Sequence, residues 1–450
     1  MNERVWPWQV AREMSGGFVL WPGIITLSMA GLALVLAAVE ERVTALTTWG
    51  HVLDRIFPPE PESAHVVLGT IAGSMITVVS VVYSILLVVL TFASAQFSPR
   101  VLVAFVEDKV SQTTLGVFVG TFVYCLLTLP SVRSQPTPFV PSIAVIIAMG
   151  LAVGCLGCLL YFIHHIAVSI QASHIVDRVA RDTERIVDQV LPAREPEFPL
   201  GEPAEPIPAG APILATESGY IRTINEAGLI AAAEAHDVSL RVDRYIGQFV
   251  AEGTPLLGVS PPDRASGPVG DACRQAFHIG PARTMEQDVE FGVLQIVDIA
   301  LKAISPAVND PTTALTCVDQ LGRILVRAAL RAPPAAVLRG RDGRPRVVMR
   351  RTSFPRMLDV AFSQIRHYGR ADVAVPLRLM RVLAELACAT QSIPYAIAIR
   401  DEGRRLAAAC AEGYALADRR ELNERLEIVE RAASLVTTAA ANESGKEVIL

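Results

Sequence analysis

The segment GTIAGSMITVVSVVYSILLVVLTFASAQFSPR, residues 69–100, carries no charged side chain before Arg100. A helix needs about 20 mostly apolar residues to cross the ~30 Å hydrocarbon core of a bilayer, and this segment exceeds that length. Small and hydroxyl-bearing residues nevertheless recur along it. The segment therefore predicts a membrane-spanning helix with a polar stripe along one side.

On a helix, the small and hydroxyl-bearing residues of this segment fall within an arc of about 100°. These residues are Gly73, Thr77, Ser80, Ser84, Thr91, Ser94 and Ser98. The opposite side is Ile, Val and Leu, which suits contact with lipid. The stripe has two interpretations, which are compatible in an oligomer. One is a helix–helix interface, where small residues allow close approach; the other is the lining of a water-filled pore built by several copies.

Apolar residues make up 51% of the 450-residue chain and concentrate before residue 165. Within this transmembrane region, residues 1–165, the expected spans are 16–39, 66–97, 114–130 and 139–163. The first span does not read as a signal peptide. Its apolar core is too long, it lacks a small-residue cleavage pattern, and three further spans follow.

Arginine and lysine residues near the span ends predict the orientation, because cytoplasmic loops carry an excess of them. On one side lie Arg4, Arg12, Arg100, Lys109, Arg178, Arg181 and Arg185. On the other side lie only Arg42, Arg55 and Arg133. Both termini, and the large C-terminal region, are therefore expected in the cytoplasm.

The interiors of the four expected spans contain no Asp, Glu, Lys or Arg. Proton-coupled transporters and pumps normally need such a residue, so this absence disfavours that class. Cys155 and Cys158 lie inside a span and are expected to pack rather than to bind metal. Gly150 and Gly154 of the same span predict close helix packing.

The histidines at the end of the fourth span raise the question of a metal site. His165 and His174 are nine residues apart on an expected helix, with Asp177 nearby. Interfacial or solvated histidines are favoured over a metal site, because ligands must converge in space. We expect no metal and no cofactor.

The C-terminal region predicts four parts. Residues 166–192 are expected to form a helical stalk, and 193–210 a linker rich in Pro and Glu. Residues 211–262 predict a small β-rich module containing a short helix capped by Asn225. This module resembles the small β-sandwich of biotinyl and lipoyl carriers, but 211–260 contain no lysine for a cofactor. Residues 263–450 are expected to be a mostly helical bundle.

Two helix starts are expected in the stretch TMEQDVEFGVLQIVDIALKAISPAVNDPTTA. Thr284 with Gln287 predicts a capping box, and Asp310 with Pro311 predicts a second N-cap. The exposed N-terminus of that second helix is a candidate anion or ligand site. Its residues are Ser305, Asn309, Asp310, Thr312 and Thr313. An ordinary helix–loop–helix corner is the alternative.

A basic stretch follows, and its RGRDGRPRVV segment predicts a hairpin around Asp342 and Gly343. The arginines expected to contact lipid headgroups are Arg339, Arg341, Arg344, Arg346, Arg350 and Arg351. Anionic headgroups attract each such residue by about 1 kcal/mol near the surface. A solvated surface is the alternative interpretation.

Three segments together resemble a bacterial family of predicted multi-pass membrane proteins, the domain-of-unknown-function 2254 family. They are the long second span ending in SAQFSPR, the SGYI…GQFV…GTPL segment, and EQDVEFGVLQIVDIALKAISPAVNDPTTA. The resemblance covers nearly the whole chain and implies a multi-pass protein of the bacterial cytoplasmic membrane. It implies no catalytic residues.

The fold class predicted is a membrane protein: a four-helix transmembrane region followed by a mixed α/β cytoplasmic region. No phosphate loop, nucleophile elbow or dinucleotide fingerprint is present, so we expect no enzyme and no catalytic residue. A net charge of −5 does not favour nucleic acid as a partner. The leading hypothesis is a homo-oligomeric passive channel for ions or small solutes, surrounded by membrane lipids and regulated by its cytoplasmic region. The alternative is a membrane-anchored sensor or scaffold without transport.

Overall fold

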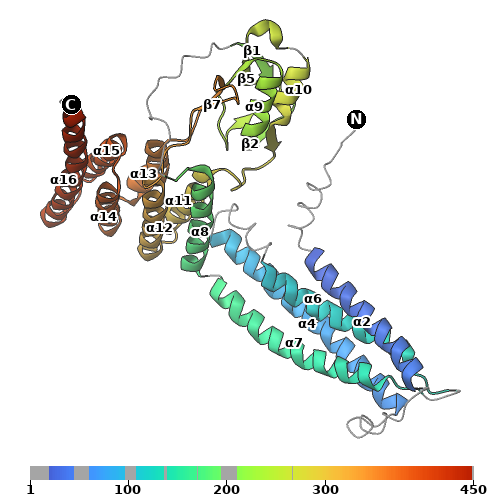
Figure 1. Cartoon of the computed structure of the whole chain (residues 1–450). Coiled ribbons are helices and arrows are strands. Elements are labelled where there is room, and N and C mark those ends of the chain that lie inside the picture. The colour runs from blue at the N-terminus through green and yellow to red at the C-terminus, as the bar shows by residue number, and fades with distance from the viewer. Residues whose placement is uncertain are drawn as a thin grey trace. The chain divides into compact units, whose positions relative to one another are not determined.

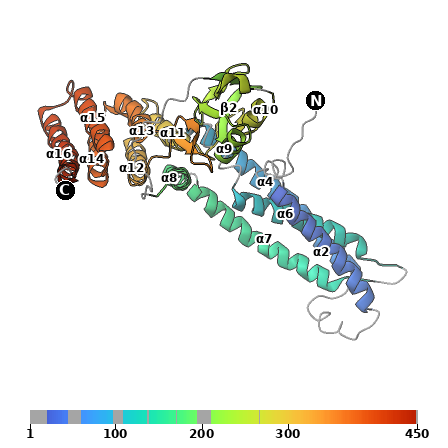
Figure 2. The same cartoon turned by 45° about the horizontal axis from the view of Figure 1, so that its top comes forward.

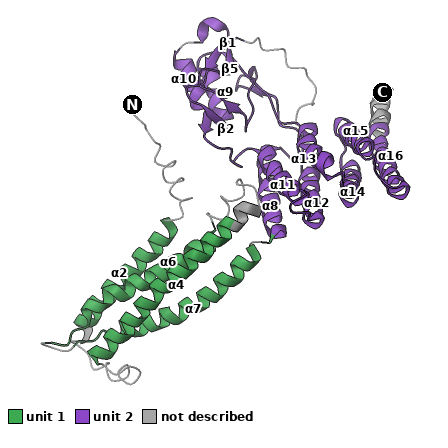
Figure 3. Ribbon diagram, turned by 180° about the vertical axis from the view of Figure 1, so that it is seen from behind, with its two compact units in different colours: residues 1–171 green, residues 172–450 purple. Residues whose placement is uncertain are grey.

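The computed structural model describes residues 20–44, 60–96, 108–135, 139–169, 171–193, 210–265 and 267–447. The chain divides into two compact units, Met1–Gln171 and Ala172–Leu450 (Figure 1; Figure 3). The long apolar helices belong to the first unit, and the described strands belong to the second. The expected linker at 193–210 lies almost entirely outside the described residues.

The described part of the first unit contains four long helices. They are α2 (Leu20–Thr44), α4 (Pro61–Gln96), α6 (Lys109–Thr128) with the 3₁₀ turn η1 (Leu129–Ser131), and α7 (Ser142–Ser169). Each is long and apolar enough to cross a membrane, and each expected span overlaps one of them. With 36 residues, α4 is about 54 Å long at ~1.5 Å per residue. It is therefore longer than the hydrocarbon core is thick.

Helix α6 packs against α2, α4 and α7. Two of its glycines explain how α2 approaches so closely. A Cβ at Gly116 would lie 2.9 Å from the Cα of Pro22, and a Cβ at Gly120 would lie 2.5 Å from the sulfur of Met29. The buried hydroxyl of Tyr124 donates to the Ala144 carbonyl at 3.0 Å and so ties α6 to α7.

One end of the bundle is held together by Glu40. Its carboxylate accepts hydrogen bonds from the backbone N–H groups of Ile143, at 2.6 Å, and Ala144, at 3.3 Å. These are N–H groups of the first turn of α7, which no other residue of the helix can satisfy. The last turns of α2 therefore provide the cap of α7. Beside this contact, Glu41 pairs with Arg133 at 3.0 Å.

The second unit contains two sheets that share one apolar core with helices α9 (Glu226–Ala235) and α10 (Gly267–Gln275). The larger sheet has the strand order β1-β5-β3-β8-β7 and the smaller has the order β4-β2-β6. The strands are β1 (Ala211–Leu214), β2 (Gly219–Ile224), β3 (Ser239–Val242), β4 (Phe249–Val250), β5 (Pro255–Ser260), β6 (Phe277–Gly280), β7 (Val337–Arg339) and β8 (Pro345–Met349). The turn η2 (Pro262–Arg264) follows β5. We call these strands with α9 and α10 the sheet body.

The sheet body extends beyond the β-rich module expected at 211–262. Strand β8 pairs in parallel with β3, with Leu240 opposite Val347, and β7 pairs with β8 as an antiparallel hairpin. This hairpin turns at Gly343, whose φ of +76° suits glycine, and so confirms the predicted hairpin. Residues 337–349 lie within the part expected to be mostly helical, because local sequence cannot reveal which distant strand a hairpin joins.

The rest of the second unit is a helical body, which continues to the C-terminal end of the described chain (Figure 2). Its helices are α8 (Ala172–Val190), α11 (Val289–Ala303), α12 (Pro311–Ala329), α13 (Phe354–Gly369), α14 (Ala374–Ala389), α15 (Ile393–Ala409) and α16 (Leu416–Glu447). The three last helices pack on one another, and α14 also packs on α12.

Helix α8 lies within the helical stalk expected at 166–192, and it is part of this helical body. It packs on α11 and α12, and it buries Ile175, Val176, Val179, Ile186 and Val187. Its approach to α11 is close, because a Cβ at Gly292 would lie 2.1 Å from the hydroxyl oxygen of Thr183. The apolar stripe of α8 needs another apolar surface to pack against. The helical periodicity alone could not show that α11 and α12 provide this surface.

The helix starts in the second unit agree with the sequence in two of three places. Asn225 caps α9 by accepting from the Gly228 N–H at 2.9 Å, and Asp310 caps α12. The expected capping box at Thr284 is wrong. Helix α11 begins at Val289, with Asp288 as its cap, and the hydroxyl oxygen of Thr284 is buried without a hydrogen-bond partner among the described residues.

Acidification is expected to loosen α8 from α12. A hydrogen bond from Arg327 holds the pKa of Asp188 below its ordinary value, and Arg331 adds to this effect. Because the pKa is lower in the folded state, the contact stabilises the fold above the ordinary value of ~3.9. That contribution is lost as the pH falls through the folded value.

Hydrogen exchange of α8, corrected for intrinsic rates, tests this expectation between pH ~7 and pH ~3. Protection should fall in the acid range. Asp188→Asn is the control, since it should exchange faster at neutral pH and lose less protection in acid. Equal acid sensitivity in both proteins would contradict the role of Asp188.

Candidate functional site

The polar stripe of α4 lies on the outside of the first unit. Gly73, Thr77, Ser80, Ser84 and Thr91 are all exposed in the single chain. A Cβ added at Gly73 would meet no atom within 4 Å. The stripe therefore contacts no other described helix of its own unit. The Ser94 side chain and Ser98 lie outside the described residues.

The face of α4 opposite the stripe is buried, which corrects the expectation that this face contacts lipid. Leu68, Ala72, Met75 and Val82 are 7% exposed or less, and they pack with residues of α6 and α7. At 100° per residue their centre lies about 150° from the centre of the described part of the stripe. Packing within the chain uses the aliphatic side, so the stripe points away from the bundle.

Each hydroxyl in the described part of the stripe is bonded to the helix that carries it. Thr77, Ser80, Ser84 and Thr91 donate to the carbonyl four residues earlier, at 2.8 to 3.1 Å. Such bonds satisfy the hydroxyl hydrogen, and they leave oxygen lone pairs directed outward. The stripe can therefore face lipid, another protein surface or water without a buried unsatisfied donor.

A second outward-facing row of small residues lies on α7. Gly150, Gly154 and Gly157 are exposed, and a Cβ at any of them would meet no atom within 4 Å. The close packing expected at Gly150 and Gly154 is therefore not made within the described part of this chain. Cys155, by contrast, is buried and lies 3.4 Å from the Thr121 hydroxyl of α6.

The candidate anion loop forms the corner between α11 and α12. Asp310 accepts from the N–H of Thr313 at 3.1 Å and from its hydroxyl at 2.5 Å. These hydrogen bonds hold the pKa of Asp310 below its ordinary value. The N-terminus of α12 thus already faces a carboxylate of its own chain. Asn309 adopts a φ of +50°. The Ser305 hydroxyl donates to the Lys302 carbonyl, and the Thr312 carbonyl accepts from the Thr316 hydroxyl.

The arginines expected at lipid headgroups are divided between internal pairs and the surface. Arg346 is buried and pairs with Asp237 at 2.9 Å and with Asp342 at 2.8 Å. Arg351 forms a two-pronged pair with Glu226, at 2.6 and 2.9 Å. Arg350 lies 5.8 Å from the centre of the Tyr245 ring. The exposed arginines are Arg339, Arg341, Arg344 and Arg350.

The structure adds one polar pair that the sequence did not predict. Asp108 caps α6 through the Ser111 N–H at 2.9 Å, and it also lies 3.1 Å from the Nε2 of His165 on α7. Burial raises the pKa of Asp108, but the hydrogen bonds from Ser111 and the nearby His165 outweigh burial and lower it overall. His165 is thus paired with a carboxylate from a distant segment, while His164 and His174 are exposed.

The first unit, with its four membrane-length helices, defines the class: a predicted multi-pass membrane protein joined to a large mixed α/β region. The chain belongs to the family described as predicted membrane protein, domain of unknown function 2254, whose profile matches residues 15–385. No solved structure matches the chain.

Uncharacterized proteins of Mycobacterium bovis and Mycobacterium tuberculosis are similar to this chain. Each is 34% identical over 351 residues, which is 75% of this chain and 66% of the relative. The match thus spans just under two thirds of these relatives' own length. Their descriptions assign no activity.

Proposed function

We propose that this protein is a homo-oligomeric channel of the bacterial cytoplasmic membrane that conducts ions or small solutes passively. In this proposal, α4 of each copy turns its stripe toward a shared water-filled path. Both termini lie in the cytoplasm, where the second unit regulates the path. The observation that carries the proposal is the direction of the stripe, which points away from every helix that packs on α4.

The composition of the exposed half of α4 supports a wet or protein-covered stripe. The stripe is flanked by large exposed apolar residues, among them Ile76, Val81 and Val88. A helix that met lipid over its whole exposed half would have no need of small and hydroxyl residues in one narrow arc. Glycine and serine on an outward face also let neighbouring helices approach closely.

The lack of ionisable residues on the stripe favours passive conduction over coupled transport. The stripe offers hydroxyl oxygens, which replace part of the hydration of an ion or solute. It offers no ionisable group that could carry a coupling charge. The Asp108–His165 pair lies at the end of the bundle where α6 begins and α7 ends, outside the stripe.

Replacing stripe hydroxyls by leucine is expected to abolish conduction. Purified protein in liposomes should give ion or solute flux, and Ser80→Leu, Ser84→Leu and Thr91→Leu should each lower it at least about tenfold, because each narrows and dries the path. Val81→Leu and Val88→Leu are matched controls on the flanks of the same helix. Flux that is absent from the unaltered oligomer, or unchanged in the stripe variants, would refute the channel.

A membrane-anchored sensor or scaffold is the second candidate. It is favoured by the hydroxyl bonds within α4, because hydroxyls satisfied by their own helix tolerate a dry surround. Cysteine substitution at Ser80 and Ser84 distinguishes the two functions. A charged, membrane-impermeant thiol reagent should label both positions in a channel, and it should label neither in a dry anchor.

A further inference from the structure

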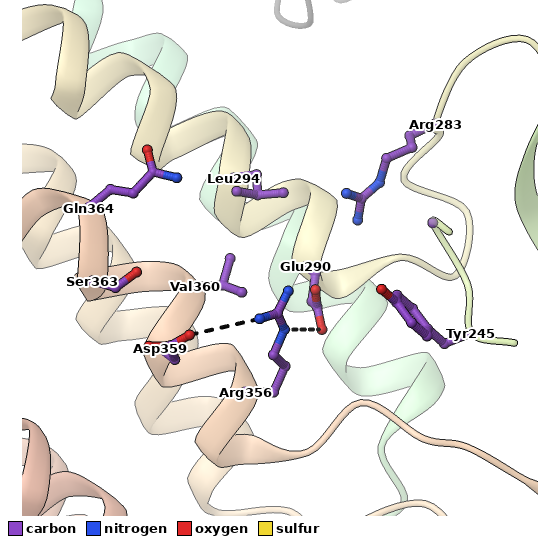
Figure 4. A pocket seen from close by; sticks show the side chains of 10 residues that line it. Tyr245, Arg283, Glu290, Leu294, Arg356, Asp359, Val360, Ser363 and Gln364 are labelled. Atoms are coloured by element: carbon purple, nitrogen blue, oxygen red, sulfur yellow. Dashed lines mark ion pairs between the residues drawn. The ribbon is translucent and has the colours of Figure 1, made fainter. Parts of the chain in front are cut away.

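The second unit contains a cavity of about 200 Å³ where the sheet body meets the helical body (Figure 4). Tyr245 and Arg283 line it from the sheet side. Glu290 lines it from α11, and Arg356 and Asp359 line it from α13. Leu294 and Val360 provide an apolar patch. None of these residues belongs to the stripe of α4.

Glu290 is the least satisfied of the charged groups in this cavity. The residue is only 7% exposed, and its carboxylate takes part in no hydrogen bond within the part of the chain that the structure describes. Its nearest cation is the Nε of Arg356, at 3.6 Å, which is too far for a hydrogen bond. A buried carboxylate with open acceptor positions is unfavourable unless something in the cavity donates to it.

Arg356 is held loosely. Its guanidinium lies between two carboxylates, 3.6 Å from Glu290 and 3.8 Å from Asp359 (Figure 4). Its side chain is 55% exposed and makes no closer contact with a carboxylate among the described residues. The planar group therefore keeps donors that can bind a carboxylate in a two-pronged manner.

The charges on the opposite wall are balanced. Arg283 binds Asp288 through two hydrogen bonds of 2.9 Å, so its charge is already matched. Gly247 lies directly over this pair, because a Cβ there would lie 2.2 Å from the Asp288 carboxylate. The remaining charges are one cation, Arg356, and two anions, Glu290 and Asp359. The cavity thus carries a net negative charge but also one available cation.

We propose that this cavity binds a small zwitterion, a molecule with an ammonium group and a carboxylate on a short carbon skeleton. The ammonium group donates to Glu290 and Asp359, and the carboxylate accepts from Arg356. Leu294 and Val360 contact the carbon skeleton. A volume of about 200 Å³ corresponds to roughly seven water molecules at ~30 Å³ each. It therefore fits a compound of similar size.

The test uses the full-length protein in lipid nanodiscs and calorimetric titration with glycine, β-alanine and γ-aminobutyrate. Propylamine and butyrate serve as the two halves of the ligand. At least one of the three zwitterions should bind at least about tenfold more tightly than either half, because only it engages both signs of charge. No binding at millimolar concentration, or equal binding of a half, would overturn the proposal.

Two variants locate the site. Glu290→Gln and Arg356→Gln should each weaken zwitterion binding at least about tenfold, since each removes one charged contact with the ligand. Glu385→Gln and Arg381→Gln are the matched controls, because they alter an exposed ion pair of 2.9 Å on α14. The thermal unfolding midpoint of each variant reports folding. If a neutral variant unfolds, Glu290→Asp or Arg356→Lys, which keeps the charge at that position, is used in its place. Binding unchanged by both neutral substitutions would place the ligand elsewhere and refute this site. No readout depends on flux, so the outcome is separate from that of the channel proposal.

Discussion

Asp288→Ala is expected to lower the free energy of unfolding of the second unit by about 4 kcal/mol. The Asp288 side chain is only 3% exposed and pairs with Arg283, whose side chain is 18% exposed. It also accepts from the Phe291 N–H at 3.0 Å and so caps α11. Removing it leaves a guanidinium with little access to water and a helix start without its acceptor. Hydrogen exchange of α11 measures the loss.

Two further substitutions separate these contributions. Asp288→Asn keeps an oxygen that can cap α11 but removes the charge, so it should destabilise less than alanine does. Asp243→Ala removes a carboxylate from an exposed pair with Arg241, which is worth about 0–1 kcal/mol. If Asp288→Ala proved no more damaging than Asp243→Ala, the buried pair would not be what holds this junction.

Gly292→Val should destabilise the contact between α8 and α11 by about 3 kcal/mol. The Cβ of any side chain at this position would lie 2.1 Å from the hydroxyl oxygen of Thr183 and 3.0 Å from its Cβ. Both atoms belong to the buried Thr183 side chain of α8, so α8 and α11 must separate. The thermal unfolding midpoint should fall, and protection from hydrogen exchange should be lost first in α8.

Substitutions at Thr183, which contacts Gly292, and at a second glycine, Gly267, provide the controls. Thr183→Ala removes the hydroxyl but keeps the Cβ, so it should restore only part of the stability of Gly292→Val. Gly267→Val places the same side chain where a Cβ meets no atom within 4 Å. An equal effect at Gly267 would mean that the loss comes from helix propensity and not from the packing of α8 on α11.

The helices of the first unit were predictable because the bilayer constrains them so strongly. Every backbone group in the hydrocarbon must be bonded within its own segment, so a long apolar run can only be a helix. Local chemistry was also sufficient at Asn225, at Asp310 with Pro311, and at the turn through Gly343. In each case the residue type satisfies a need of the adjacent backbone.

The errors all concern partners that are distant in the sequence. Thr284 and Gln287 have the spacing of a capping box, but Gln287 instead accepts from the Ile224 N–H of β2 at 3.0 Å. Asp288 becomes the cap instead, because its carboxylate accepts from the Phe291 N–H at 3.0 Å. Likewise, the aliphatic side of α4 could have met lipid or protein, and only the packing of α6 and α7 decides between them.

The candidate sites show the same limit. The stripe was visible because its residues recur with the period of a single helix. The cavity was not, since Tyr245, Glu290 and Arg356 come from three segments and have ordinary spacing in the chain. The pairing of Asp108 with His165 spans 57 residues, and no local pattern marks it.

The parallel pairing of β8 with β3 has a consequence for how the second unit can move and evolve. The chain leaves the sheet body after β6, builds α11 and α12, returns to add β7 and β8, and departs again into α13. With the earlier passage from α8 to β1, four covalent connections therefore join the two bodies, where a hinge between exchangeable modules would have one. These connections permit small sliding motions but oppose wide opening, and they prevent either body from being transplanted alone into another protein by recombination of a single contiguous gene segment.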